Sequence, residues 1–314
     1  MKISIRHLVF AGLMSASVLV AHARIERVVE KSFPVSGAGT LRVETQGGGI
    51  RVTPAADNVI RVTVTQRINA STEAEADELL KKLELTFEPA GNDLRVVAKY
   101  EKKPIGFTWG SWPPVAVDLA VSLPAAYATQ LNTSGGAITV GDLLGHAVLR
   151  TSGGSIKLGR MGGTVDAHTS GGAITLAAAR GRVELKTSGG NIAVGDVQGP
   201  AELSTSGGGI KVDNVAGALN AHTSGGSIRA GITGPIKEAC TLSTSGGSVT
   251  VSVDKSAAFQ LDASTSGGGV DASGLTITLE STKRDRSRLA GAVNGGGPLL
   301  KLRSSGGGIS VRAN

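Results

Sequence analysis

The chain has 314 residues, a formal net charge of +7, 46 glycines, 3% aromatic residues and one cysteine. Because charges of both signs are scattered along the chain, we expect no nucleic-acid partner, which would need a concentrated basic face. A single cysteine excludes an internal disulfide, and so few large side chains favour a stack of thin layers over one thick hydrophobic core.

Residues 1–23 carry the pattern of a secretory signal peptide. Lys2 and Arg6 precede a long apolar run, and the segment ends on Ala21-His22-Ala23, a small-x-small cleavage pattern. The run is shorter than a membrane-spanning helix, and no later run is long enough to span. We therefore expect an exported mature chain with a net charge of +5 and no transmembrane segment, periplasmic, secreted or at the cell surface.

Residues 24–128 predict a β-rich N-terminal region with one helix. Alternating segments such as LRVETQGGGIRVTP and NVIRVTVTQRI predict strands, and STEAEADELLKKLEL predicts an amphipathic helix near 72–83. Ser71 or Thr72 can cap this helix, and Lys81-Lys82 lie near its end. Since an open sheet edge invites aggregation, we expect the helix to cap the first turn of the structure that follows.

Residues 129–314 repeat the tetrapeptide Thr-Ser-Gly-Gly at a regular interval. Six successive copies start 18 residues apart and the next two steps are of 21 residues, which is typical of a solenoid. The step to the variant Ser-Ser-Gly-Gly is 39 residues, which predicts one further turn without the tetrapeptide. The copies start at Thr133, Thr151, Thr169, Thr187, Thr205, Thr223, Thr244, Thr265 and, for the variant, Ser304.

Apolar residues alternate with polar ones on both sides of each tetrapeptide, so each turn contains two short strands. The predicted fold class is all-β: a right-handed parallel β-solenoid (β-helix) with 18–21-residue turns and one short N-terminal capping helix. A left-handed hexapeptide β-helix would need an apolar residue at every sixth position, and the series Ile138, Leu144, Arg150 breaks that rule. A charged excursion near 281–298 is expected to shield the last turns.

The Gly pair lies between the two strands of a turn, where two interpretations compete. A phosphate-binding loop would lead into a helix and place a lysine consistently, whereas here a strand follows and no lysine recurs. A corner of the architecture fits better, because glycine adopts backbone angles that other residues resist and lets the chain bend sharply. The preceding threonine has inward parity, so we expect ladders of threonine hydroxyls paired between turns.

Three features together resemble a known family: the Thr-Ser-Gly-Gly-x-Ile-x-Val repeats, the helix before LTFEP and the closing VNGGGPLLKLRSSGGGI. They are similar to the bacterial "putative adhesin" family of β-strand-repeat envelope proteins, catalogued as a domain of unknown function. The resemblance covers nearly the whole mature chain. It implies an extracytoplasmic β-solenoid and brings no catalytic residues to this sequence.

An outward column of acids is the first candidate site. Asp166, Glu184 and Glu202 fall on successive turns, about 5 Å apart at strand spacing. Such carboxylates can serve a retaining glycosidase or hold calcium. The next outward column is largely basic, so cross-strand ion pairs explain both columns, and we favour that interpretation. This second column reads Arg150, His168, Lys186, Ser204 and His222.

A segment rich in aromatic residues, YEKKPIGFTWGSWPP, is the second candidate site. Its glycines and prolines predict a loop. Tryptophan faces suit sugar rings and lysines suit acidic groups, but the rings can also form a hydrophobic lid over the first turn, and we favour the lid. The ligand-binding candidates are Trp109, Trp112, Phe107, Lys102 and Lys103.

No cofactor and no metal site are expected, because the histidines do not cluster and Cys240 has the inward parity of a small core residue. The sequence favours a non-enzymatic exported protein of the bacterial cell envelope that binds an envelope polymer, a glycan or a protein, with self-association left open. One alternative is a carbohydrate-active enzyme (glycosidase or lyase) on the β-helix face. Another is a structural envelope-stress component without a ligand.

Overall fold

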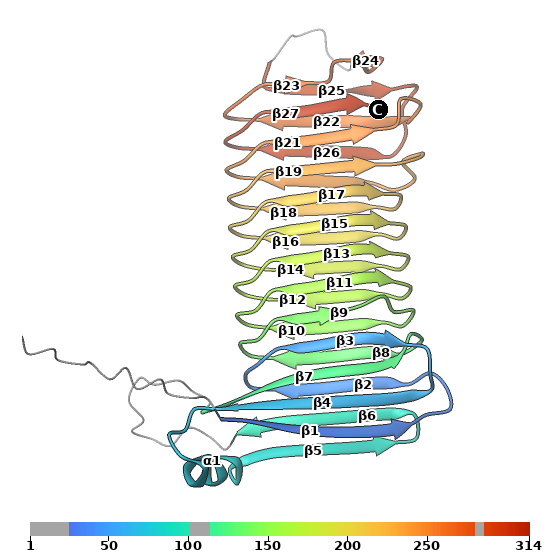
Figure 1. The fold of residues 1–314 in the computed structure, drawn as a ribbon. Helices are drawn as coiled ribbons and strands as arrows, with labels where there is room; N and C mark the ends of the chain where they lie inside the picture. The colour runs from blue at the N-terminus through green and yellow to red at the C-terminus, as the bar shows by residue number, and fades with distance from the viewer. Residues whose placement is uncertain (1–24, 101–113, 280–285) are drawn as a thin grey trace, which may run out of the picture.

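The computed structural model describes residues 25–100, 114–279 and 286–314, which form two long β-sheets stacked face to face and one short helix (Figure 1). We call the 13-stranded sheet sheet A and the 14-stranded sheet sheet B. The expected signal peptide lies outside the described residues. Within the described residues, no helix is long and apolar enough to cross a membrane.

The strands of sheet A follow one another from the N-terminal end of the stack. They are β1 (Ile25–Pro34), β4 (Val59–Ile68), β7 (Val115–Pro124), β3 (Ile50–Ala55), β9 (Ile138–Val140), β11 (Ile156–Met161), β13 (Ile174–Ala179), β15 (Ile192–Val197), β17 (Ile210–Val215), β19 (Ile228–Ile232), β21 (Val249–Val253), β27 (Ile309–Ala313) and β23 (Val270–Asp271).

Sheet B begins at the same end of the stack. Its strands are β5 (Leu83–Ala90), β6 (Asp93–Tyr100), β2 (Thr40–Thr45), β8 (Ala128–Thr133), β10 (Ala147–Thr151), β12 (Val165–His168), β14 (Val183–Lys186), β16 (Ala201–Thr205), β18 (Leu219–Thr223), β20 (Cys240–Thr244), β26 (Leu299–Ser304), β22 (Phe259–Thr265), β25 (Arg288–Val293) and β24 (Ile277–Leu279).

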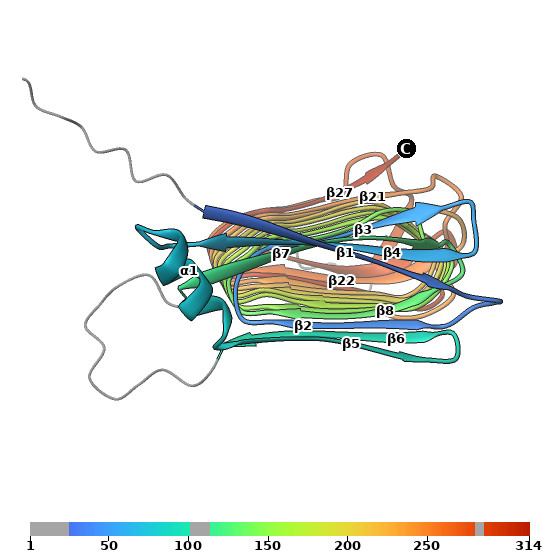
Figure 2. The same ribbon diagram turned by 60° about the horizontal axis from the view of Figure 1, so that its bottom comes forward.

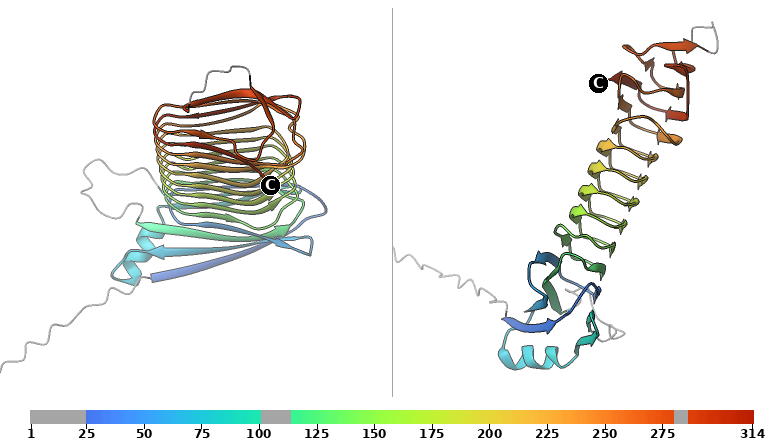
Figure 3. Two further views of the ribbon diagram at one scale, coloured as in Figure 1. Left: turned by 90° about the horizontal axis from the view of Figure 1, so that it is seen from above. Right: turned by 90° about the vertical axis from the view of Figure 1, so that its right-hand side faces the viewer.

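Successive turns of the chain stack in register. Ala147 of β10 pairs with Val165 of β12, and Ile156 of β11 pairs with Ile174 of β13, so residues 18 apart in the sequence lie side by side on neighbouring strands. The two sheets are therefore largely parallel and lie as two rows of strands, as the side view in Figure 3 shows. The expected all-β, largely parallel architecture with one short helix is confirmed.

The core lies between the two sheets and is one continuous cluster of inward-facing apolar side chains. Their alternation with outward residues gives the repeating buried pattern of each short strand, for example in β10 and β13. Cys240 is 1% exposed in this cluster, as its parity predicts. The threonines of the tetrapeptide are also buried, with exposed fractions between 0 and 7%.

The glycine pair is an architectural corner, but not for the reason that the sequence suggests. No glycine of a described Thr-Ser-Gly-Gly copy adopts a left-handed φ. The constraint is close approach between turns: a Cβ added to Gly190 would lie 2.1 Å from the carbonyl oxygen of Gly172 in the preceding turn. The expectation that these glycines supply unusual backbone angles is wrong, because stacking distance requires them instead.

The threonine hydroxyls also behave differently from the expected ladder, in which they would pair with one another. Thr187 Oγ1 donates to the carbonyl oxygen of Gly172 in the preceding turn at 2.8 Å, and it accepts the N–H of Gly190 at 3.3 Å. The hydroxyl thus bridges the backbones of two turns. Both bonds recur at Thr151, Thr169, Thr205, Thr223 and Thr244.

The N-terminal end of the stack is closed by antiparallel strands and the helix. β1, β4 and β7 pair antiparallel, as do β5 and β6, whereas the turn formed by β2 and β3 is inserted between β6–β7 and β8–β9. Helix α1 (Glu73–Leu80) is capped by Thr72 and buries Ala76. Figure 2 shows α1 beside β1 and β4 at this end, which is the end at which the sequence predicts a capping helix.

The C-terminal end is rearranged in a similar way. The last turn, β26 and β27, lies between β20–β21 and β22–β23, so the chain terminus is inside the stack and not at its end. The expected extra turn within the 39-residue step is wrong: β24 and β25 form an antiparallel pair, and β25 pairs antiparallel with β22. The described part of the charged excursion therefore contributes β25, the second strand from the edge of sheet B, and β24 is the edge strand.

Candidate functional site

The outer face of sheet B carries the acidic column that the sequence predicts. Asp166 pairs in register with Glu184, and Glu184 with Glu202, on β12, β14 and β16. The basic column lies two residues along the same strands, with His168 opposite both Arg150 and Lys186. We call the set Arg150, Asp166, His168, Arg182, Glu184, Lys186 and Glu202 the charged ladder.

Every carboxylate of the charged ladder contacts a cation. Arg150 donates to Asp166 at 2.5 Å and also to the main-chain carbonyl of Asp166 at 3.0 Å. Lys186 lies 2.5 Å from Glu184 and 3.4 Å from Glu202. The acids and cations of the ladder therefore pair along and between neighbouring turns, as the ion-pair interpretation of the two columns predicts.

Arg182 extends this network from the turn that precedes β14. Its guanidinium lies 3.0 Å from Glu202 and 3.8 Å from Glu184, so both of these glutamates contact two cations. The pKa of Glu184 is held below its ordinary value, chiefly by the hydrogen bond from Lys186. The glutamate side chains are 27 and 42% exposed, so each contact is worth little in free energy.

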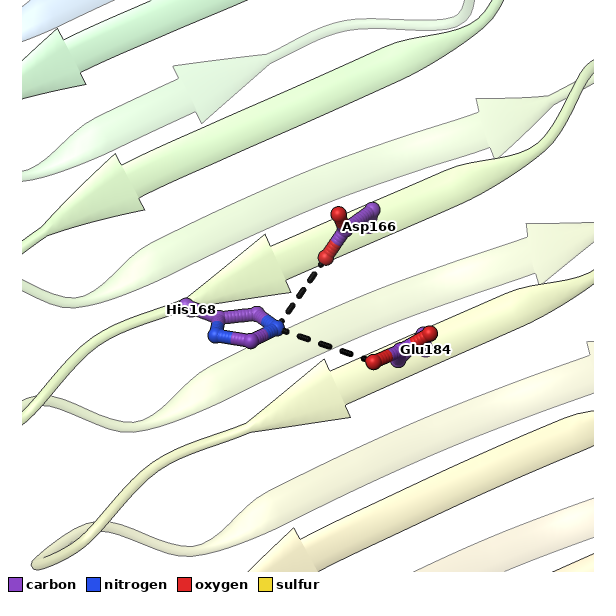
Figure 4. Close-up of side chains that lie close together, drawn as sticks. All are labelled: Asp166, His168 and Glu184. Atoms are coloured by element: carbon purple, nitrogen blue, oxygen red, sulfur yellow. Dashed lines mark ion pairs between the residues drawn. The ribbon is translucent and has the colours of Figure 1, made fainter.

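Asp166, His168 and Glu184 form a tight group within the charged ladder (Figure 4). His168 Nε2 lies 3.1 Å from Asp166 Oδ1 and 4.0 Å from Glu184 Oε1, and all three ligand-type atoms lie within 4.8 Å of one another. The Nε2 and Oδ1 atoms are solvent-inaccessible, and their contact lacks hydrogen-bond geometry. Sequence reasoning missed this group because it compared His168 only with the distant His222.

Burial, more than the neighbouring charges, lowers the pKa of His168. Burial lowers the pKa of His168 most strongly, and the nearby Arg150 lowers it further, while Asp166 raises it by less. The lowered pKa favours the neutral ring at pH 7, and a neutral ring does not form a pair of opposite charges with Asp166. Imidazole and two carboxylates are donor types that suit a divalent metal, but Arg150 and Lys186 already hold one oxygen of each carboxylate.

A groove of about 420 Å³ runs along the edge of the charged ladder, where the Thr-Ser-Gly-Gly corners stack. Its lining combines the three basic-column residues Arg150, His168 and Lys186 with the exposed corner serines Ser152 and Ser170. The groove spans several turns, so it offers hydroxyls and basic groups in rows instead of one enclosed pocket. Such an arrangement suits contact with an extended molecule.

The second candidate site of the sequence lies outside the described residues. Segment 101–113 contains all five proposed ligand-binding side chains, so binding and the lid both stay predictions. These side chains are Trp109, Trp112, Phe107, Lys102 and Lys103.

Solved structures that match this chain include proteins of Bacteroides and Parabacteroides species. A "putative adhesin" from Bacteroides fragilis is 12% identical, with 91% of this chain and 97% of that chain covered and a TM-score of 0.41. A "putative adhesin" from Parabacteroides merdae is 11% identical, with 92% and 97% covered and a TM-score of 0.42. A "putative lipid binding protein" from Parabacteroides distasonis is 15% identical, with 90% and 96% covered and a TM-score of 0.39.

Identities this low carry no information on ligand or activity. No curated protein matches the chain. The model of the Toastrack DUF4097 family, by contrast, matches residues 40–312, which is most of the chain and includes every strand of the two sheets except β1 and the last residue of β27. This range contains the repeats, the short helix and the stacked turns of the two sheets. The chain belongs to the Toastrack DUF4097 family.

Proposed function

We propose that this protein is an exported, non-enzymatic binding or scaffold protein of the bacterial cell envelope, located in the periplasm or at the cell surface. In this proposal residues 1–23 are removed on export, and the mature chain winds as a right-handed solenoid with 18–21-residue turns. The observation that supports its non-enzymatic part is the charged ladder: a regular sheet face on which each acid contacts a neighbouring cation.

The chemistry of the charged ladder favours binding over glycoside hydrolysis. A glycosidase needs one carboxyl group with a raised pKa to act as a general acid. Lys186 instead holds the pKa of Glu184 below its ordinary value. Asp166 is likewise committed to Arg150, which contacts both its carboxylate and its main-chain carbonyl. The acids that the carbohydrate-active alternative would use as catalytic groups are therefore engaged in ion pairs.

Co-sedimentation tests the proposal directly. The mature chain, residues 24–314, is incubated across a salt series with three bacterial fractions: washed sacculi, outer membranes and intact cells. We expect saturable, partly salt-resistant binding to one of these fractions. Binding to none of them would contradict the binding function and favour a structural component without a ligand. Release of reducing sugar or unsaturated product from a polysaccharide panel would instead restore the enzyme alternative.

A further inference from the structure

The outer face of sheet A carries basic residues in one straight column. Arg51 of β3 pairs in register with Thr139 of β9, which pairs with Lys157 of β11. The same column continues through the uncharged Thr175 and Ala193 on β13 and β15 and then reaches Lys211 and Arg229 on β17 and β19. We call Arg51, Lys157, Lys211 and Arg229 the cation column.

The cation column differs from the charged ladder of sheet B in its partners. Among the described residues, Arg51, Lys157 and Arg229 form no ion pair, and all three are exposed. Lys211 alone contacts an acid, Asp213, at 2.7 Å. On sheet B, by contrast, Arg150 and Lys186 are both held by carboxylates. The two columns thus differ: the charged ladder is neutralised by its own acids, whereas three of the four cations in the cation column have no acid partner among the described residues.

The surroundings of the cation column are small and mostly uncharged. The next positions along β11 to β19, two residues beyond the column, are Gly159, Ala177, Gly195, Asp213 and Gly231. A Cβ on Gly195 would lie 2.0 Å from the carbonyl oxygen of Ala177, so the close stacking of the strands leaves no room for a side chain at this position. The exposed cations therefore stand above a flat strip, where a polymer can lie against the sheet.

The column is long enough for several charges of one extended molecule. Six steps between neighbouring strands separate Arg51 from Arg229, which is about 29 Å at strand spacing. A groove of about 350 Å³ opens at the Arg51 end, where Thr65 and the ion pair of Arg67 and Asp118 also line it. The spacing is uneven: two steps lie between Arg51 and Lys157, three between Lys157 and Lys211, and one between Lys211 and Arg229.

We infer that the cation column is the docking surface for a linear anionic polysaccharide. The inference rests on the proposed binding function and names its partner class. A polysaccharide with acidic groups repeated along its chain matches a straight row of cations, three of which have no acid partner among the described residues. The attraction between the two is sensitive to salt. The threonine hydroxyls in the column, Thr139 and Thr175, can hydrogen-bond to sugar hydroxyls.

Other polyanions fit this face less well. Single-stranded nucleic acid is held largely by stacking on aromatic rings, and the described strands β3, β9, β11, β13, β15, β17 and β19 contain no aromatic residue. An anionic bilayer is bound by apolar insertion in addition to charge. The exposed large apolar residues of the described chain, such as Val28 and Leu144, lie outside the column.

Binding to immobilised polygalacturonate, a carboxylated polysaccharide, tests the inference, with neutral dextran as the uncharged control. The test variant is Arg51→Gln, Lys157→Gln, Arg229→Gln. The matched control is Lys82→Gln, Lys237→Gln, Lys255→Gln, which removes three exposed positive charges from other surfaces. We expect the test variant to bind about tenfold more weakly or worse, with a smaller salt dependence, and the control to bind as wild type does.

If the two triple variants lose the same amount of affinity for polygalacturonate, the inference is overturned, because binding would then depend on net charge and not on the position of the cations. Tighter wild-type binding to oligothymidylate or to phosphatidylglycerol vesicles than to polygalacturonate would also overturn it. Envelope co-sedimentation separates this inference from the proposed function. If wild type and the test variant co-sediment equally well, the function stands and the cation column is wrong; if wild type binds no fraction, the function itself fails.

Discussion

The side-chain hydroxyl of Thr169 donates a 2.8 Å hydrogen bond to the main-chain carbonyl of Gly154 in the preceding turn. The same oxygen accepts the N–H of Gly172, three residues along its own turn, at 3.3 Å. One buried hydroxyl thus satisfies a carbonyl and an amide where the chain turns between the two sheets and no strand ladder can do so. Its repetition along the stack explains why threonine precedes the glycine pair.

Replacing Thr169 with valine tests the hydroxyl bridge. Valine keeps the shape but leaves the Gly154 carbonyl and the Gly172 amide without this partner, so we expect the free energy of unfolding to fall by about 1–3 kcal/mol. Urea denaturation measures the change. Ser170→Ala is the control, because Ser170 is exposed, and it should change stability by less than about 0.5 kcal/mol. A Thr169→Val protein as stable as wild type would contradict the bridging role.

The two glycines of one tetrapeptide should differ sharply in their tolerance of a methyl group. A Cβ on Gly172 would lie 2.1 Å from the Gly154 carbonyl oxygen, whereas a Cβ on Gly171 would lie 3.3 Å from its nearest neighbour. We expect Gly172→Ala to cost at least about 2 kcal/mol and Gly171→Ala to cost under about 1 kcal/mol. Thermal and urea unfolding of both variants provide the comparison. Similar costs at both positions would mean that stacking distance does not select the second glycine.

Periodicity predicted the parts of the fold that repeat. The 18-residue interval, the inward parity of Thr169 and Cys240, and the acids in register at Asp166 and Glu184 all follow from alternation along one strand and repetition between turns. The physical role of Gly172 was missed, because an alternation pattern says which face a residue occupies and not how closely two backbones approach. That distance appears only once the turns are stacked.

The order of the turns at both ends could not be predicted from the repeat. Ser304 continues the tetrapeptide pattern, yet its strand β26 lies between β20 and β22 instead of after β22. Every inner turn offers the same backbone ladder, so alternation fits either place. The long connections outside the repeat decide between the two places.

The group of Asp166, His168 and Glu184 was missed for a related reason. Its members belong to two different outward columns, and alternation along a strand does not say which residues of neighbouring columns contact each other.

Deletion of residues 299–314 tests the inserted last turn. This change removes the partner that β20 and β22 share, together with the buried residues Leu302 and Val311. We expect exposed strand edges and aggregation, detected by size-exclusion chromatography with light scattering. The control removes Ala313 and Asn314 alone and should stay monomeric or keep the wild-type assembly. If deletion of residues 299–314 leaves the assembly and the melting temperature unchanged, β20 and β22 can pair directly with each other.

His168 should make the protein less stable as the pH falls. Its pKa in the folded chain lies below the ordinary 6.5, chiefly because of burial and then because of Arg150. The unfolded chain therefore binds a proton at higher pH than the folded chain does, so this contribution to stability is complete above about pH 6.5 and is lost progressively below it. Urea midpoints between pH 8 and 5 should fall less in His168→Gln than in wild type. Proton NMR titration of His168 gives the direct check: removal of the neighbouring charge in Arg150→Met should raise the pKa of His168, and a wild-type pKa at or above 6.5 would contradict the prediction.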